Sequence, residues 1–116
     1  MHRFHYIFDA KNIDVGKLND EDLIKKILLK LVDLCEMKVL FGPVVARGMD
    51  YNPGFSAFAI IDFSHISMHT FSETKEMAVD IFSCKSYDPL KVKNYLLEAF
   101  AVAEKDVIFF EVKYPE

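Results

Sequence analysis

The residues that could do chemistry are concentrated in one stretch of thirty, 55–84. It contains a hydroxyl, two imidazoles and a thiol, at Ser64, His65, His69 and Cys84. Around the two histidines the side chains alternate as in a half-buried strand, so both histidines share one face. Groups of these types can act as nucleophile, base and acid when they lie close together. The surrounding elements therefore decide whether they meet.

Two strand-like segments joined by turn-forming residues predict a hairpin. The first strand, the turn and the second strand cover residues 63–71, 72–75 and 77–84. If the strands pair directly on either side of the turn, Ser64 lies opposite Ser83 or Cys84. This register predicts that a hydroxyl, a thiol and an imidazole share one small patch, which is enough for chemistry.

Each of these residues also has a structural explanation. His65 and His69 would form a metal pair on a helix, but on a strand they lie about 13 Å apart, so we predict no metal site. Cys84 alone is typical of a small buried apolar residue, and Ser64 of an ordinary strand serine. The chain has neither a Gly-x-Ser-x-Gly elbow nor a Gly-rich phosphate loop. Spacing alone leaves open whether the patch is functional or structural.

The composition predicts a single globular domain over residues 1–116, because 52% of the residues are hydrophobic. Eleven Phe and no Trp favour a sheet-rich core. A net charge of −4 argues against nucleic acid as a partner. No stretch approaches the roughly 20 apolar residues of a membrane span, and the first residues lack a signal-peptide core. Two cysteines give no disulfide framework, so we expect a cytoplasmic protein.

Hydrophobic periodicity predicts the order β-α-β-β-β-β-α-β. The predicted strands cover residues 3–10, 38–46, 55–62, 65–71, 77–84 and 107–112. The first helix follows N-cap candidates at 19–22 and runs to about Met37. The second begins at Asp88-Pro89 and runs to about Glu104. We therefore expect an α+β two-layer sandwich, a mostly antiparallel sheet with two helices on one face.

Two features of this arrangement carry further expectations. The seventeen residues 55–71 have uninterrupted strand character, whereas strands are usually about five to six residues long, so the chain should bend near Phe63-Ser64. A sheet with helices on one face also leaves its other face uncovered. We therefore expect a homodimer formed through that face.

The string from Ser64 to Glu73, followed by Asp80 to Cys84, resembles the prokaryotic S-adenosylmethionine decarboxylase family. Members of that family carry Ser-His-(apolar)-(Ser/Thr)-(apolar)-His-Thr-Trp-Pro-Glu and then Asp-(apolar)-Phe-Thr-Cys. The spacing from His69 to Cys84 matches, as does that from Ser56 to Ser64. The resemblance is sharp over residues 56–84 and follows the element order of most of the chain.

This resemblance implies a self-processing proenzyme with a pyruvoyl cofactor made from Ser64. By analogy, the Ser64 hydroxyl attacks the carbonyl of Phe63 to give an ester. His69 then removes the serine α-proton, Ser56 assists, and the chain is cut between residues 63 and 64. A strained bond at this position would favour the rearrangement.

The resemblance further implies a carboxy-lyase that decarboxylates S-adenosylmethionine for spermidine and polyamine synthesis. The pyruvoyl carbonyl would form a Schiff base with the substrate amine and draw electrons from the departing carboxylate. Cys84 matches the residue that returns a proton to the α-carbon. Glu73 matches the acid that holds the ribose hydroxyls. Phe71, with Tyr51 or Phe55, would stack on adenine and attract the sulfonium ion.

The chain departs from the family pattern at several positions. Phe63 stands where Glu is usual, Phe71-Ser72 where Trp-Pro is usual, and Arg3-Phe4-His5 where Gly-x-His is usual. The cofactor-forming residues are intact, but the substrate is left open. A pyruvoyl-dependent arginine or ornithine decarboxylase is one alternative, with Asp50 or Asp62 pairing a distal cation. An unprocessed, non-catalytic relative is another, and Phe63 motivates it.

Overall fold

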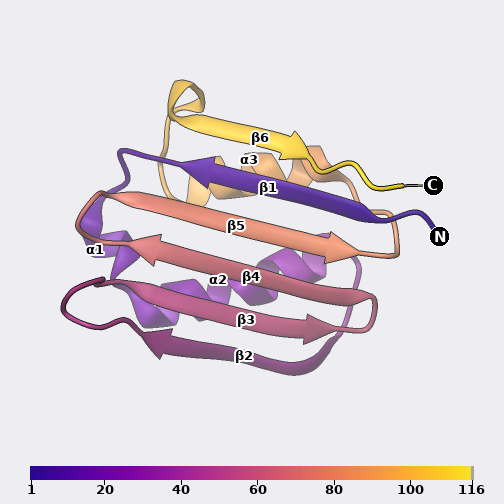
Figure 1. Ribbon diagram of the computed structural model, residues 1–116, viewed down its shortest axis with the longest axis horizontal. Helices are drawn as coiled ribbons and strands as arrows, with labels where there is room; N and C mark the ends of the chain where they lie inside the picture. Colours follow the sequence, from indigo (N-terminus) through magenta and orange to yellow (C-terminus); the bar gives the residue numbers. More distant parts are fainter. Residues whose placement is uncertain (116) are drawn as a thin grey trace.

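A six-stranded sheet forms one layer of the protein and the helices form the other, in a computed structural model that describes residues 1–115 (Figure 1). The strands are β1 Phe4–Ala10, β2 Val39–Arg47, β3 Phe55–Ile61, β4 Ser64–Phe71, β5 Glu76–Ser83 and β6 Val107–Glu111. The helical elements are α1 Val15–Leu18, α2 Glu21–Leu34, α3 Pro89–Ala99 and the 3₁₀ turn η1 Glu104–Asp106. The sheet order is β2-β3-β4-β5-β1-β6, and every pair is antiparallel. This arrangement confirms the predicted fold class.

The two long helices begin at the residues that the sequence predicted. The Asp20 carboxylate accepts the Leu23 amide hydrogen at the start of α2. The Asp88 carboxylate accepts the Leu90 and Lys91 amide hydrogens at the start of α3. Both helices cover the same face of the sheet, as Figure 1 shows.

Alternation along β4 and β5 follows the prediction, because every second side chain lies in the core beneath the helices. From these two strands the core takes Ile66, Met68, Thr70, Met77, Val79, Ile81 and Ser83. The Thr70 hydroxyl donates to the Leu18 carbonyl and accepts the Phe55 amide hydrogen, so it is fully satisfied. The opposite side chains of both strands remain on the open face.

The register of the β4–β5 hairpin is the predicted one. Phe71 pairs with Glu76 next to the turn, and Ser64 pairs with Ser83 at the far end. Residues 62 and 63 form a tight turn between β3 and β4, which confirms the expected break in the long strand-like run. The same turn sets the β3–β4 register, in which Ser56 lies opposite His69.

The predicted end of the second helix at Glu104 is wrong, because α3 ends at Ala99. Ala101 has a φ of +50°, and the Val102 amide donates back to the Leu97 carbonyl, which closes the helix. Val102 then enters the core. Apolar spacing beyond the helix end thus reflects a buried loop residue rather than another helical turn.

The open face of the sheet is rich in exposed apolar side chains. Those that lie on it with more than a third of their surface exposed include Phe41, Val44, Ile60, Phe71, Ile108 and Phe110. An apolar surface of this extent is typical of an interaction site in a small protein. Within residues 1–115, no helix is both long and apolar enough to cross a membrane.

Candidate active site

Ser64 lies at the first position of β4 and has an unusual backbone conformation. Its φ is +146°, a region that residues other than glycine rarely occupy and that costs on the order of 1–3 kcal/mol. The ladders with Ile61 on β3 and Ser83 on β5 hold it there. The sequence-predicted break is therefore a point of backbone strain.

The carbonyl before Ser64 is held by the end of the neighbouring strand. The Cys84 amide hydrogen is donated to the Phe63 carbonyl oxygen, with an N···O distance of 3.0 Å. A backbone N–H aimed at a carbonyl oxygen stabilises the negative charge that develops when a nucleophile adds to the carbonyl carbon. Ser64 directly follows that carbonyl in the chain, and its backbone is strained. The local arrangement therefore suits an acyl shift from the Ser64 nitrogen to the Ser64 hydroxyl.

The two cysteines lie in different surroundings. Cys35 caps the end of α2 inside the core, and burial raises the pKa of its thiol to about 12. Cys84 is half-buried, just beyond the end of β5 and beside the Ser64 turn. Cys84 is therefore the cysteine that lies beside the Ser64 turn.

Ser56 and His69 form a second polar pair on the open face. They are direct register partners on β3 and β4, and Ser56 Oγ lies 2.8 Å from His69 Nδ1. When Nδ1–H donates to the hydroxyl, Nε2 carries the lone pair and can accept a proton. The contact therefore holds the His69 ring in one orientation.

Two hollows lie near this pair. One of about 270 Å³ is lined by Ser56, His69, Ser67 and apolar residues of β2 and β3. The other, of about 450 Å³, is lined by Phe71 and Glu73 together with loop residues such as Pro53. The predicted ribose-binding acid and one predicted stacking ring thus share a hollow close to His69.

Within one chain, His69 does not lie in the same patch as Ser64 and Cys84. Ser64 and His69 are five positions apart on β4, which is roughly 16 Å at about 3.3 Å per residue. Alternation also sends their side chains toward opposite faces of the sheet. Ser64 and Cys84 therefore lie at one end of the strand pair, and Ser56 and His69 lie at the other.

The other predicted aromatic residues differ in how accessible they are. Tyr51 is 83% exposed in the loop before β3, and Phe71 is 36% exposed at the end of β4. Phe55 is only 6% exposed in the helix-side core, with the Arg47 guanidinium 5.6 Å from its ring centre. Because Phe55 faces the core, it is not available as a substrate contact, and that expectation is corrected.

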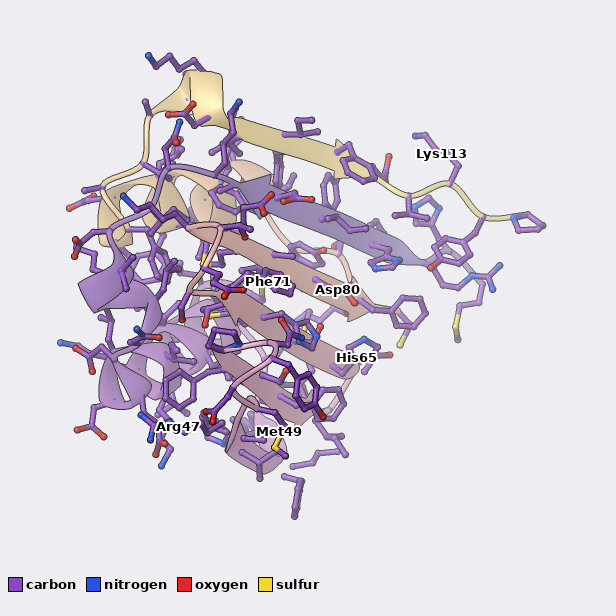
Figure 2. The ribbon with its side chains drawn as sticks, turned by 60° about the vertical axis from the view of Figure 1, so that its left-hand side comes forward. Arg47, Met49, His65, Phe71, Asp80 and Lys113 are labelled. Carbon is purple, nitrogen blue, oxygen red and sulfur yellow. The ribbon has the colours of Figure 1, made fainter. Side chains whose placement is uncertain are left out.

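The open face carries a polar network that the sequence did not predict. Asp80 accepts a hydrogen bond from His5 Nε2, and His5 Nδ1 lies 2.6 Å from the Tyr114 hydroxyl. The other Asp80 oxygen lies 3.6 Å from His65 Nε2 and 3.5 Å from Ser67 Oγ. Figure 2 shows His65 and Asp80 together on the side away from the helices. The sequence did carry one signal for this network. Side-chain alternation along β1 and β5 places both His5 and Asp80 on the open face of the sheet.

Aromatic stacking fixes the ring of His65 within this network. Phe58 and Phe82 flank it, each with a ring-centre distance of 5.5 Å and interplanar angles of 29° and 16°. His65 and His69 therefore have different neighbours, although they share a strand face. Among residues 1–115, no cluster of three or more His, Cys, Asp or Glu could hold a metal ion.

A family model described as S-adenosylmethionine decarboxylase matches residues 4–111. The chain belongs to this family. An S-adenosylmethionine decarboxylase proenzyme of Pyrococcus abyssi is 34% identical to it over 98 residues, which are 83% of this chain and 68% of the relative. A proenzyme of the same name from Clostridium botulinum strain Hall is also 34% identical over 98 residues, covering 82% and 80%.

The fold of this chain is similar to that of a solved adenosylmethionine decarboxylase. The adenosylmethionine decarboxylase of Aquifex aeolicus superposes with a TM-score of 0.75 at 20% identity. The match covers 98% of this chain and 92% of the other. At 20% identity, this match shows that the two proteins share a fold. The family assignment rests on the family model and the sequence relatives.

Proposed function

We propose that the chain is a self-processing decarboxylase of S-adenosylmethionine that serves polyamine and spermidine synthesis. One observation carries the proposal: the strained Ser64 follows a carbonyl that the Cys84 amide already polarises. The family relatives are named proenzymes, which supports self-processing. Together these points favour a cut between residues 63 and 64.

Cleavage would begin when the Ser64 hydroxyl adds to the Phe63 carbonyl carbon. The peptide C–N bond then breaks and an ester forms, while the Cys84 N–H stabilises the charge on the carbonyl oxygen. Leaving the left-handed φ would release strain at the same step. A base must then take the Ser64 α-proton so that the ester is eliminated, and His69 held by Ser56 is the candidate.

Residue 64 fits the pyruvoyl group that this chemistry makes. It becomes the first residue of the second fragment, at the start of β4, beside the half-buried Cys84. A pyruvoyl group supplies a carbonyl that acts as an electron sink when an amino acid loses carbon dioxide. The thiol of Cys84 would hold the proton that is delivered to the substrate α-carbon.

The distance between Ser64 and His69 supports a homodimer in which each active site is shared. One chain presents the Ser64–Cys84 end, and the other presents His69 with Ser56. Stacked open faces would also cover the exposed apolar side chains of both sheets. A second copy of the chain would thus supply a base near Ser64. It would also bury the exposed apolar side chains of the open face.

A two-fold axis that lies between the faces and across the strands achieves this pairing. Such an axis makes a self-complementary contact, in which the start of β4 in one copy faces its far end in the other. Sheets packed face to face lie about 10 Å apart, so side chains from both can meet. The partner's His69 would then approach the start of β4, where Ser64 lies, and the reverse contact would form the second site.

The substrate would lie between the two ends in this arrangement. The Phe71–Glu73 hollow close to His69 provides a carboxylate for ribose hydroxyls and a ring for adenine. Tyr51, on the exposed loop before β3, is a second ring for the sulfonium end. The α-carbon would lie toward residue 64 and Cys84.

Intact-mass measurement of the purified wild-type protein tests the processing. Two fragments are expected, from residues 1–63 and 64–116, with the second blocked at its N-terminus. Phenylhydrazine or borohydride should form an adduct on the second fragment. An intact chain in active protein would overturn the proposal, and an intact inactive chain would indicate a non-catalytic relative.

Co-expression of two impaired variants tests the shared site. Alone, Ser64→Ala should remain uncleaved, and His69→Ala should be cleaved about 10²-fold or more slowly than wild type. In mixed dimers, the His69→Ala chain keeps Ser64 and receives His69 from its partner, so that chain should be cleaved. Two tags of different mass identify which chain is cut, and no cleavage in the mixture would contradict the shared site.

An assay of carbon dioxide release identifies the substrate. S-adenosylmethionine, arginine and ornithine are compared at equal concentrations with the processed protein. Release from S-adenosylmethionine is expected. The Asp62 carboxylate accepts the Lys38 amide hydrogen at 3.0 Å, which makes it a poor partner for a basic substrate. Release from arginine or ornithine alone would overturn the proposed substrate.

A further inference from the structure

Lys85 lies beside the bond that self-processing would cut. It directly follows Cys84, whose amide hydrogen is donated to the Phe63 carbonyl. The Lys85 ammonium lies 5.4 Å from the centre of the Phe63 ring. Its Nζ also donates to the Glu36 carbonyl at 2.8 Å, just past the end of α2. A positive charge is therefore anchored next to residue 63.

The other charged and dipolar groups beside Phe63 disfavour a new negative charge. The Asp62 carboxylate is adjacent in the chain and is held by the Lys38 amide. The Glu36 carbonyl belongs to the C-terminal, partially negative end of α2. A second carboxylate at residue 63 would be repelled by both groups unless a cation offset them. The cation that the structure places there is Lys85.

We propose that Lys85 stabilises the carboxylate that leaves when the processing ester is eliminated. This inference rests on the proposed self-processing. In that step a base removes the α-proton of residue 64, the Cβ–Oγ bond breaks, and its electron pair remains on Oγ. The products are dehydroalanine at residue 64 and a carboxylate at Phe63. No oxidant or reductant takes part.

The carboxylate would be received by two donors with different roles. The Cys84 amide already contacts one oxygen of the Phe63 carbonyl and helps the acyl shift that makes the ester. The Lys85 ammonium lacks such a role while the carbonyl is neutral, and gains an ionic partner only as the leaving group becomes charged. Lys85 would therefore act on the elimination rather than on ester formation.

Substitutions at Lys85 separate the charge from the helix-capping contact. Lys85→Gln removes the charge but keeps a neutral N–H donor, one bond closer to the backbone than the lysine Nζ, whereas Lys85→Arg keeps both a charge and N–H donors. Chains made by cell-free translation are followed by intact mass, with and without hydroxylamine, which cleaves an ester but not a peptide bond. Thermal unfolding of both variants monitors the capping contact separately.

The Gln variant should complete elimination roughly five- to tenfold more slowly than wild type, the effect of one unit charge a few ångströms away in a partly solvated site. Hydroxylamine-sensitive ester should accumulate in it, and the Arg variant should behave like wild type. High salt should slow wild type toward the Gln variant.

Two outcomes overturn the inference. One is a Gln variant that processes at the wild-type rate without ester, and the other is an Arg variant as slow as Gln. If the wild-type chain itself never cleaves, the failure lies in the proposed self-processing and not in the role of Lys85.

Discussion

At the start of β4, Ser64 has a left-handed φ beside a tight turn, whereas toward the other end of the strand His69 lies in regular register opposite Ser56. The first position holds strain and a polarised carbonyl. The second holds a hydrogen-bonded imidazole with a fixed orientation. In the proposed reaction, bond rearrangement would take place where the backbone can relax, and proton transfer where a regular strand holds the imidazole in place.

The largest effect is expected at the strained end. Ser64→Ala should abolish cleavage and all decarboxylase activity, because no hydroxyl remains to attack the Phe63 carbonyl. Ser67→Ala is the matched control, since Ser67 lies on the same strand and should leave cleavage intact. Intact mass and carbon dioxide release are the measurements. A Ser64→Ala protein with full activity would show that residue 64 does not make the cofactor.

The second largest effect is expected on the cleavage rate when the two histidines of β4 are replaced in turn. His69→Ala should slow cleavage by about 10²–10⁴-fold, the usual contribution of a general base. His65→Ala should have a much smaller effect on cleavage, although His65 is nearer to Ser64 in the chain. Time courses of fragment formation report both rates. The opposite order would point to a site contained within one chain.

Cys84→Ala should separate the backbone of this residue from its side chain. Cleavage should continue, because the contact with Phe63 uses the main-chain N–H, which alanine keeps. Turnover of processed enzyme should fall by about 10²-fold or more, because the proton donor is lost. Cys35→Ala, which removes the core thiol, serves as the control for general destabilisation. Failure of the Cys84 variant to cleave would assign the thiol to processing.

The smallest effect tests the strain directly. Ser64→Gly should be more stable than Ser64→Ala by about 1 kcal/mol, because glycine adopts a positive φ without steric cost. At Ser67, in the regular part of β4, glycine should be less stable than alanine by about 0.5–1 kcal/mol. Urea unfolding gives both differences, with the two Ser67 variants made in the Ser64→Ala background so that every chain compared is uncleaved. Equal signs at the two positions would mean that Ser64 is not strained.

Most of the fold followed from local sequence signals. Alternation in β4 and β5, the caps at Asp20 and Asp88, and the hairpin register all agree with the structure. The end of α3 did not follow, because Val102 continues the apolar pattern while Ala101 turns the chain out of the helix. A left-handed residue other than glycine leaves little trace in a sequence.

The candidate site was predictable by residue type but not by arrangement. The Ser56–His69 contact follows from the β3–β4 register, which depends on how tightly residues 62 and 63 turn. The separation of Ser64 from His69 was already present in the strand spacing. The Asp80 network was not predicted, because it joins β1, β4 and the tail residue Tyr114, which are far apart in sequence. Long-range contacts of this kind are absent from local patterns.

The strand order has a consequence for the fate of the two products. A cut after residue 63 gives one product with β1, β2 and β3 and another with β4, β5 and β6. In the sheet these strands interleave, since β1 lies between β5 and β6 while β3 lies against β4. Three strand pairs therefore join the two products by backbone hydrogen bonds. Neither product can dissociate unless these pairs are broken. Breaking the chain would leave a two-chain protein held together by the β3–β4, β1–β5 and β1–β6 strand pairs.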